Sequence, residues 1–197
     1  NIKLLKKFIK KNKENIPIDE GGIISRTELI KKNKFNNRWF GWYKKVLTLF
    51  LAIDLYQYHQ KYDIFVWIDC DCVIKSHVSN LYLQQRLNNK SLSYFYGPIR
   101  KKKETGIESG LLFFDIRKNK KGVEIIKKWH DLYRSKEYLS YSRWDDGYLL
   151  KILLLEKDKN LFNKHITDLG LKSNSQDSHV MTGCDIWSKI IHQKGSA

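Results

Sequence analysis

Residues 65–74, F-V-W-I-D-C-D-C-V-I, constrain the fold of this chain more than any other stretch. The first four are apolar and rich in β-branched and aromatic side chains, which predicts a buried strand. If the strand continues, Asp69 and Asp71 point to the same side, because alternate residues of a strand share a face. Two carboxylates directed at one point repel each other unless a cation lies between them. The pattern predicts a Mg²⁺ or Mn²⁺ site at the carboxyl edge of an α/β sheet; the alternative is an aspartate pair that caps a turn.

Composition and charge narrow the class of protein. The chain has 197 residues and 42% hydrophobic content, which predicts one globular domain over 1–197. It contains no apolar run long enough to span a bilayer, and its lysine-rich start lacks the apolar core of a signal peptide. The net charge of +16 favours anionic partners, namely nucleic acid, an acidic membrane surface or phosphorylated small molecules, although a solvated basic surface is the alternative.

The three cysteines argue against a disulfide framework. Their count is odd, and Cys70 and Cys72 are too close in sequence to bridge each other easily. We therefore expect a reducing, cytoplasmic setting, with Cys70 and Cys72 as small core residues that face away from the two aspartates.

Hydrophobic periodicity predicts an alternation of helices and strands, and hence an α/β domain with a mixed central sheet. The predicted helices are 2–11, 42–58, 122–133 and 145–155, and the predicted strands are 65–68, 91–96 and 111–116. A basic loop is expected at 100–103, and irregular structure after Lys157. With Tyr94 and Tyr96, this loop is predicted to form a mobile lid, the alternative being an ordinary solvated loop.

Two further motifs carry polar residues next to predicted elements. Glu108, Ser109 and Gly110 stand immediately before an apolar strand, where a glycine allows the backbone to approach a ligand closely. Asp145 and Asp146 stand at the start of a helix. They could complement the helix dipole, bind an acceptor or act as a general base.

The last motif is His192-Gln-Lys194-Gly195, close to the carboxyl terminus. A neutral imidazole is a suitable third ligand for a Mn²⁺ ion held by two carboxylates. Lys194 could neutralise a diphosphate. On its own, a histidine here would be an ordinary surface residue.

These motifs, in this order, resemble those of the GT-A glycosyltransferases over about residues 39–195. In that family a D-x-D motif after an apolar strand holds Mn²⁺ against the diphosphate of a nucleotide sugar. The resemblance implies a GT-A-like, Rossmann-like mixed sheet flanked by helices. It also implies transfer of a hexose or pentose, from a donor expected to be a UDP-sugar, to a hydroxyl of a glycan or glycoprotein acceptor. Within that family the chain resembles the small transferases related to galactosyl- and xylosyltransferases, including those encoded by large DNA viruses.

The resemblance also implies a role for each matching residue. The metal ligands are Asp69, Asp71 and His192, and the catalytic acids are Asp145 and Asp146. The donor-binding residues are Lys44, Lys45, Cys70, Glu108, Ser109, Gly110, Lys194 and Gly195. The implied cofactor is Mn²⁺ or Mg²⁺.

The chain departs from this family at its start, and rival functions exist. GT-A domains open with a strand that begins the uridine pocket. Here, either that strand lies upstream in a longer protein, or segments 16–18 and 23–24 take its place.

The first rival function is that of a metal-dependent nuclease or nucleotidyltransferase, which also needs paired carboxylates. A nucleotidyltransferase would need a glycine-serine turn upstream of its acids, and none precedes Asp69. The second rival is a non-catalytic basic binding module, which leaves the acid pair unexplained.

Overall fold

A computed structural model describes residues 39–59, 62–174, 176 and 179–193. In this part of the chain a four-stranded mixed sheet has the order β1-β4-β3-β5. Its strands are β1 (Ile64–Ile68), β3 (Leu92–Phe95), β4 (Glu108–Asp115) and β5 (Ile166–Asp168). Strand β4 pairs antiparallel with β1 and β3, whereas β3 and β5 are parallel. The predicted mixed α/β sheet is confirmed. The predicted helix 2–11 and segments 16–18 and 23–24 lie outside the described residues.

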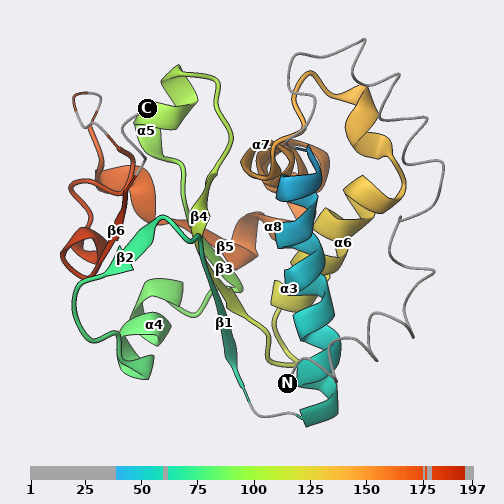
Figure 1. Ribbon diagram of the computed structural model, residues 1–197. Helices are drawn as coiled ribbons and strands as arrows, with labels where there is room; N and C mark the ends of the chain where they lie inside the picture. The colour runs from blue at the N-terminus through green and yellow to red at the C-terminus, as the bar shows by residue number, and fades with distance from the viewer. Residues whose placement is uncertain (1–38, 60–61, 175, 177–178, 194–197) are drawn as a thin grey trace.

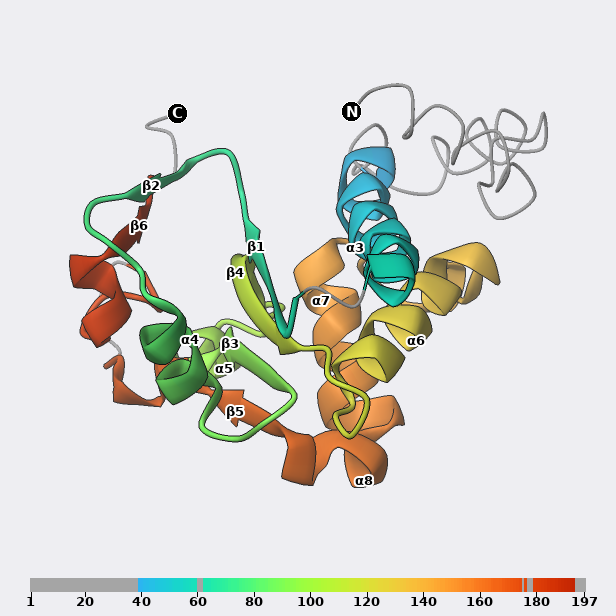
Figure 2. The same ribbon diagram turned by 90° about the horizontal axis from the view of Figure 1, so that it is seen from below.

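Helices and a smaller sheet cover the two faces of the central sheet (Figures 1 and 2). Side chains of β4 alternate between two cores: Leu112 and Phe114 belong to one, and Leu111 and Phe113 to the other. The helices on the first face are α3 (Trp39–His59), α6 (Gly122–Arg134), α7 (Asp146–Lys151) and α8 (Lys159–Phe162). The second face carries α4 (Asn80–Leu87), the short helix η6 (Asp185–Ser188) and the paired strands β2 (Cys72–Ile74) and β6 (Ile190–His192).

Helices α3 and α6 form where the apolar spacing predicts them. Helix α3 buries Tyr43, Val46, Leu49 and Ile53, which lie on one side because they are three or four residues apart. Helix α6 likewise buries a stripe that includes Trp129. The predicted helices 42–58 and 122–133 are therefore confirmed, although α3 begins three residues earlier than predicted and each helix ends one residue later.

The segment that follows β1 differs from the prediction. The strand ends at Ile68, and the amide of Cys72 donates to the carbonyl of Asp69 at 3.0 Å, so residues 69–71 form a turn rather than a continued strand. The chain becomes extended again as β2. Cys70 is exposed, so the prediction that it is a core residue is wrong: the turn moves it out of the sheet. Cys72 is half-buried in β2 and packs against the second core. All three cysteines of the chain are free thiols.

Three other segments also differ. The expected loop 100–103 lies largely in helix α5 (Gly97–Lys102), where Pro98 occupies the first turn and needs no amide partner. Residues 108–110 belong to strand β4 instead of preceding it. Beyond Lys157, where irregular structure was expected, the chain forms β5 and β6 together with short helices. Each of these two strands has three residues, too few to show a period.

The predicted helix 145–155 is observed in two parts. Asp145 is the N-cap of α7, and its carboxylate accepts from the amide of Tyr148. Helix α7 ends at Lys151 and continues as a π-helix, η3 (Ile152–Lys157).

Candidate active site

A cleft of about 580 Å³ lies at the carboxyl end of β1. It is lined by Lys44 and Lys45 of α3, residues 69–71 of the turn, Ser109 of β4 and Asp146 of α7. These residues meet because α3 and α7 pack on the same face of the sheet and β4 lies beside β1. Much of the predicted site therefore comes together in one hollow.

The ammonium group of Lys45 is at the centre of this cleft. Its Nζ lies 2.9 Å from Oδ1 of Asp69 and 2.6 Å from Oδ2 of Asp146. It also donates to the hydroxyl and the carbonyl of Ser109, both at 3.1 Å. Burial by itself lowers the pKa of Lys45, but the carboxylates of Asp146 and Asp69 outweigh this effect, so its pKa is raised. Lys45 is therefore a buried cation that holds two acids in place.

The two predicted catalytic acids have different environments. Asp146 is buried, and burial raises its pKa even though Lys45 acts in the opposite direction. One of its oxygens accepts from the amide of Gly147 at 2.9 Å. Asp145 instead caps α7 and binds the guanidinium of Arg143. Of the pair, Asp146 is the acid that lines the cleft.

Asp69 and Asp71 also have different partners. Asp69 accepts from the indole of Trp67 at 2.5 Å in addition to its contact with Lys45. Asp71 is more exposed, and its Oδ2 lies 2.9 Å from Nε2 of His192. The pairing of β2 with β6 brings His192 to this position, since Cys72 lies opposite His192 in the register.

This corner of the cleft offers a group of residues that could hold a metal ion. Ligand atoms of Asp71, Cys72 and His192 lie within 4.8 Å of one another. The thiol of Cys72 donates to the carbonyl of Gly110, and burial, followed by the charge of Asp71, raises its pKa to about 11. The carboxylate oxygen of Asp71 and the imidazole nitrogen of His192 are both types of ligand that divalent metal ions use in proteins.

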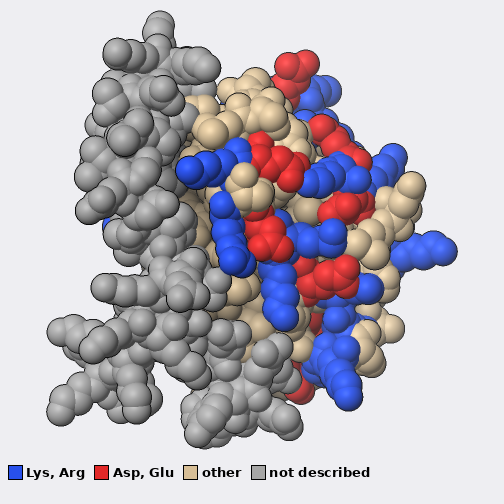
Figure 3. All heavy atoms as spheres, turned by 90° about the vertical axis from the view of Figure 1, so that its right-hand side faces the viewer, with Lys and Arg blue, Asp and Glu red and all other residues tan. Residues whose placement is uncertain are grey.

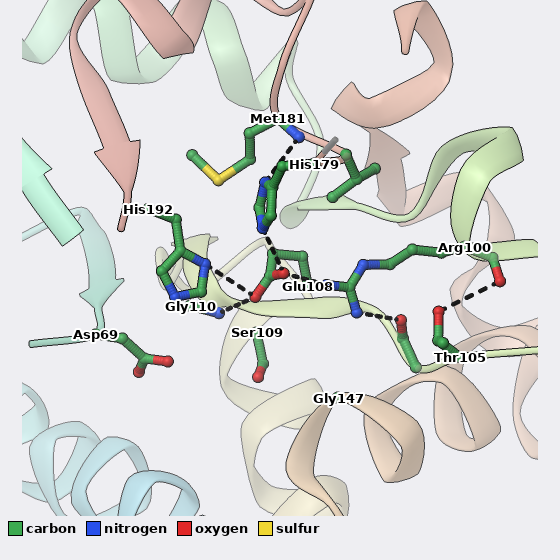
Figure 4. A network of polar contacts seen from close by, with 12 residues as sticks. Asp69, Arg100, Thr105, Glu108, Ser109, Gly110, Gly147, His179, Met181 and His192 are labelled. Atoms are coloured by element: carbon green, nitrogen blue, oxygen red, sulfur yellow. Dashed lines mark hydrogen bonds and ion pairs between the residues drawn. The ribbon is translucent and has the colours of Figure 1, made fainter. Parts of the chain in front are cut away.

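Glu108 lies beside this corner but outside the cleft (Figure 4). The pairing of β3 with β4 shifts register near the start of β4, which interrupts the regular alternation of side chains there. Ser109 consequently contacts Lys45, whereas the buried carboxylate of Glu108 contacts Arg100, His179 and His192. The sequence predicts Glu108 as a donor-binding residue; in the structure its carboxylate makes these contacts and does not line the cleft.

Sequence reasoning missed three residues of the site. Trp67 counted only as an apolar strand residue, although its indole binds Asp69. Arg100 was expected in a loop, and His179 lies in a segment without periodicity. The predicted donor-binding residues Lys194 and Gly195 lie outside the described residues.

Comparisons with known proteins find little. No protein-family model and no curated protein matches the chain. Among solved structures, a glycosyltransferase involved in the glycosylation of the major capsid of PBCV-1 is similar with a TM-score of 0.46 and 13% identity, over 79% of this chain and 71% of that chain. Similarity at this level assigns no function. In the part of the chain that the structure describes, no helix combines the length and apolar character needed to cross a membrane.

Proposed function

We propose that this chain is a metal-dependent glycosyltransferase of the GT-A type. It would transfer a hexosyl or pentosyl group from a nucleotide-diphosphate sugar, a UDP-sugar in our proposal, to a hydroxyl of a glycan or glycoprotein. The observation that carries the proposal is the cleft itself, because it combines Asp71 with Lys44, Lys45 and a buried acid. His192 adjoins the cleft through its contact with Asp71. Its volume of about 580 Å³ suits a ligand of nucleotide-sugar size.

The donor would lie with its diphosphate at the corner formed by Asp71 and His192. A Mn²⁺ or Mg²⁺ ion held there would neutralise the charge that develops on the leaving diphosphate. Asp69, fixed by Lys45 and Trp67, would complete the acidic edge of this corner. Lys44 adds a positive charge at the cleft, and we assign Lys194 and Gly195 to the same donor-binding role by their place in the motif.

The acceptor side of the cleft would be formed by Asp146. Its raised pKa makes it a better proton acceptor than an ordinary aspartate, and it lines the cleft together with Ser109. As the bond from the sugar to the diphosphate breaks, the acceptor oxygen forms the new bond to the sugar, and its proton passes to Asp146. Asp145 supports this acid by capping the helix that carries it.

Ligand-dependent stabilisation separates this proposal from a nucleic-acid enzyme. The midpoint of thermal unfolding would be measured with Mn²⁺ and UDP, with Mn²⁺ and DNA, and with each component alone. A ligand that binds the folded state but not the unfolded state raises the stability of the protein. We therefore expect UDP to raise the unfolding midpoint, and to do so only when the metal is present. Stabilisation by DNA with metal, and none by UDP, would contradict the proposal.

The variant Asp71→Ala tests the metal corner directly. We expect it to fold like the wild type, because Asp71 is exposed, and to lose metal-dependent hydrolysis of the donor. A screen of several nucleotide sugars for slow hydrolysis needs no acceptor, so it identifies the donor at the same time. Full activity of Asp71→Ala with added Mn²⁺ would overturn the metal assignment.

A further inference from the structure

The buried carboxylate of Glu108 has two sides. On one side, Oε2 forms an ion pair with Arg100 and lies 3.0 Å from Nε2 of His179. On the other side, Oε1 accepts from the amide of Gly110 and lies 3.5 Å from Nδ1 of His192 (Figure 4). The side chains of Glu108 and His192 are each only 6% exposed, so both are almost entirely removed from bulk solvent.

The hydrogen-bond roles in this network follow from the backbone. The amide of Met181 donates to Nδ1 of His179 at 3.2 Å, so Nδ1 is an acceptor. The proton of a neutral His179 is then on Nε2, where it points at Glu108. His179 and Arg100 both act as donors toward Glu108, and they hold its carboxylate in place. This arrangement argues against a metal ion between Glu108 and His179, because the nitrogen that would bind it carries a proton.

His192 stands between Glu108 and Asp71. Its Nε2 lies 2.9 Å from Asp71, whereas its Nδ1 is buried and makes no hydrogen bond to any described residue. The acceptor within reach of Nδ1 is Oε1 of Glu108. Gly110 makes this approach possible, because a Cβ at that position would lie 2.9 Å from Cε1 of His192.

We propose that Glu108 is a positioning residue that accepts a hydrogen bond from the protonated Nδ1 of His192 and thereby directs the lone pair of Nε2 toward the metal beside Asp71. An imidazole that binds a metal through one nitrogen commonly donates from the other to a carboxylate, which fixes both its tautomer and its orientation. This inference rests on the proposed function, since it assumes a metal at Asp71 and His192. It assigns Glu108 to the support of that metal rather than to the donor.

Two measurements that do not depend on activity test the proposal. The first is the tautomer of His192 with Mg²⁺ bound, from long-range ¹H–¹⁵N correlation spectra. We expect the proton on Nδ1 in the wild type, and we expect its ¹H resonance to move upfield in Glu108→Gln, because a neutral amide accepts a weaker hydrogen bond than a carboxylate. A proton on Nε2 in the wild type would overturn the proposal.

The second measurement is the affinity for Mn²⁺ alone, by calorimetry. We expect Glu108→Gln to weaken it by about 10- to 100-fold, the range found for partners of metal-binding histidines. The matched control is Asp168→Asn. Asp168 is also a structural carboxylate, which accepts from the amides of Tyr96, Gly97 and Gly170, but it does not contact the cleft. This control should lose stability and keep its Mn²⁺ affinity.

The outcomes separate the inference from the proposed function. If Asp71→Ala loses Mn²⁺ binding and Glu108→Gln keeps it, the role of Glu108 is wrong and the metal site stands. If the wild type binds no Mn²⁺, or binds it as well as Asp71→Ala does, both fail. An equal loss of affinity in Asp168→Asn and Glu108→Gln would show that destabilisation explains the effect, and the inference would be rejected.

Discussion

Lys45 determines the electrostatics of the cleft more than any other single residue. Two carboxylates, from the turn after β1 and from the start of α7, meet at its ammonium group. Without it, Asp69 and Asp146 would be two partly or fully desolvated acids that repel each other. Lys45 therefore stabilises the folded protein and also holds Asp146 in position.

We expect Lys45→Met to lower the free energy of unfolding by roughly 3 kcal/mol, because removal of one partner leaves a buried carboxylate uncompensated. The measurement is urea unfolding at neutral pH. The control is Lys44→Met, in the same turn of α3 but exposed, which should change stability very little. Adding Asp146→Leu to the first variant should recover part of the loss. A double variant less stable than Lys45→Met would contradict this account.

At the scale of elements, close backbone contact fixes the place of α7 and hence of Asp146. The amide of Ile107 donates to the carbonyl of Gly147 at 2.9 Å, just before β4 begins. A Cβ at Gly147 would overlap the carbonyl of Ile107, and one at Gly106 would overlap the backbone of Tyr148. Both positions therefore require glycine, because the backbone before β4 and the backbone of α7 lie too close together for a side chain.

Gly147→Ala should therefore displace α7. We expect a loss of about 2 kcal/mol or more in the free energy of unfolding, as for other overpacked sites, together with reduced donor hydrolysis. The matched control is Gly41→Ala in α3, where an added Cβ meets nothing within 4 Å. That control should be neutral or slightly stabilising, because alanine favours helix. Equal stabilities of the two variants would refute the packing argument.

The contact between α3 and α6 predicts a dependence of stability on pH. The ring of His130 is buried, stacks on Phe50 with centroids 4.0 Å apart and lies 3.1 Å from the hydroxyl of Tyr43. Burial lowers its pKa below the ordinary 6.5, although Asp131 acts in the opposite direction and Arg134 adds to the lowering. The unfolded chain thus binds this proton more readily than the folded one. The resulting stability is present above pH 6.5 and is lost as the pH falls toward the lowered pKa.

The stability of the wild type relative to His130→Phe should fall as the pH is lowered through this window. The slope is at most about 1.4 kcal/mol per pH unit. The measurement is urea unfolding of both proteins from about pH 7.5 to about pH 5. The phenylalanine ring keeps the stacking on Phe50, so the difference reports the imidazole. Parallel pH profiles would rule out His130 as the titrating group.

Local sequence predicts those helices and strands in which apolar side chains recur on one buried face. The spacing of apolar residues predicts α3 and α6, and the run from Leu111 to Phe114 predicts the core of β4. Strands β5 and β6 were missed because each has three residues and pairs with a strand far away in sequence. The same limit applies to the site. Asp69 and Asp71 marked its position, but the turn between them, and the contact of Glu108 with Arg100 and His179, depend on tertiary packing.

At the scale of the whole molecule, the charge of +16 is not a uniform basic surface. On the face shown in Figure 3, lysine and arginine side chains are interspersed with aspartate and glutamate. Several basic residues are engaged in ion pairs, among them Lys128 with Asp158 and Lys157 with Glu137. On this face we therefore expect nucleic acid to bind through a diffuse electrostatic field rather than in a specific groove.

The dependence of affinity on salt concentration should distinguish DNA from UDP as a ligand. Binding of DNA, measured by fluorescence anisotropy, should weaken steeply between about 50 and about 200 mM salt, because it depends on the release of counterions. Binding of UDP with Mn²⁺ should change much less, since its contacts lie in a partly buried cleft. A DNA affinity that resists salt would favour a dedicated nucleic-acid surface.

The pairing of β2 with β6 also sets the moment at which the metal corner can exist. Asp71 lies just before β2 and His192 is the last residue of β6, so the two come from opposite ends of the described chain. During synthesis the aspartates leave the ribosome well before the histidine, because the chain emerges from its amino end. The proposed metal corner can therefore form only after the segment that carries His192 has been made and β6 has paired with β2.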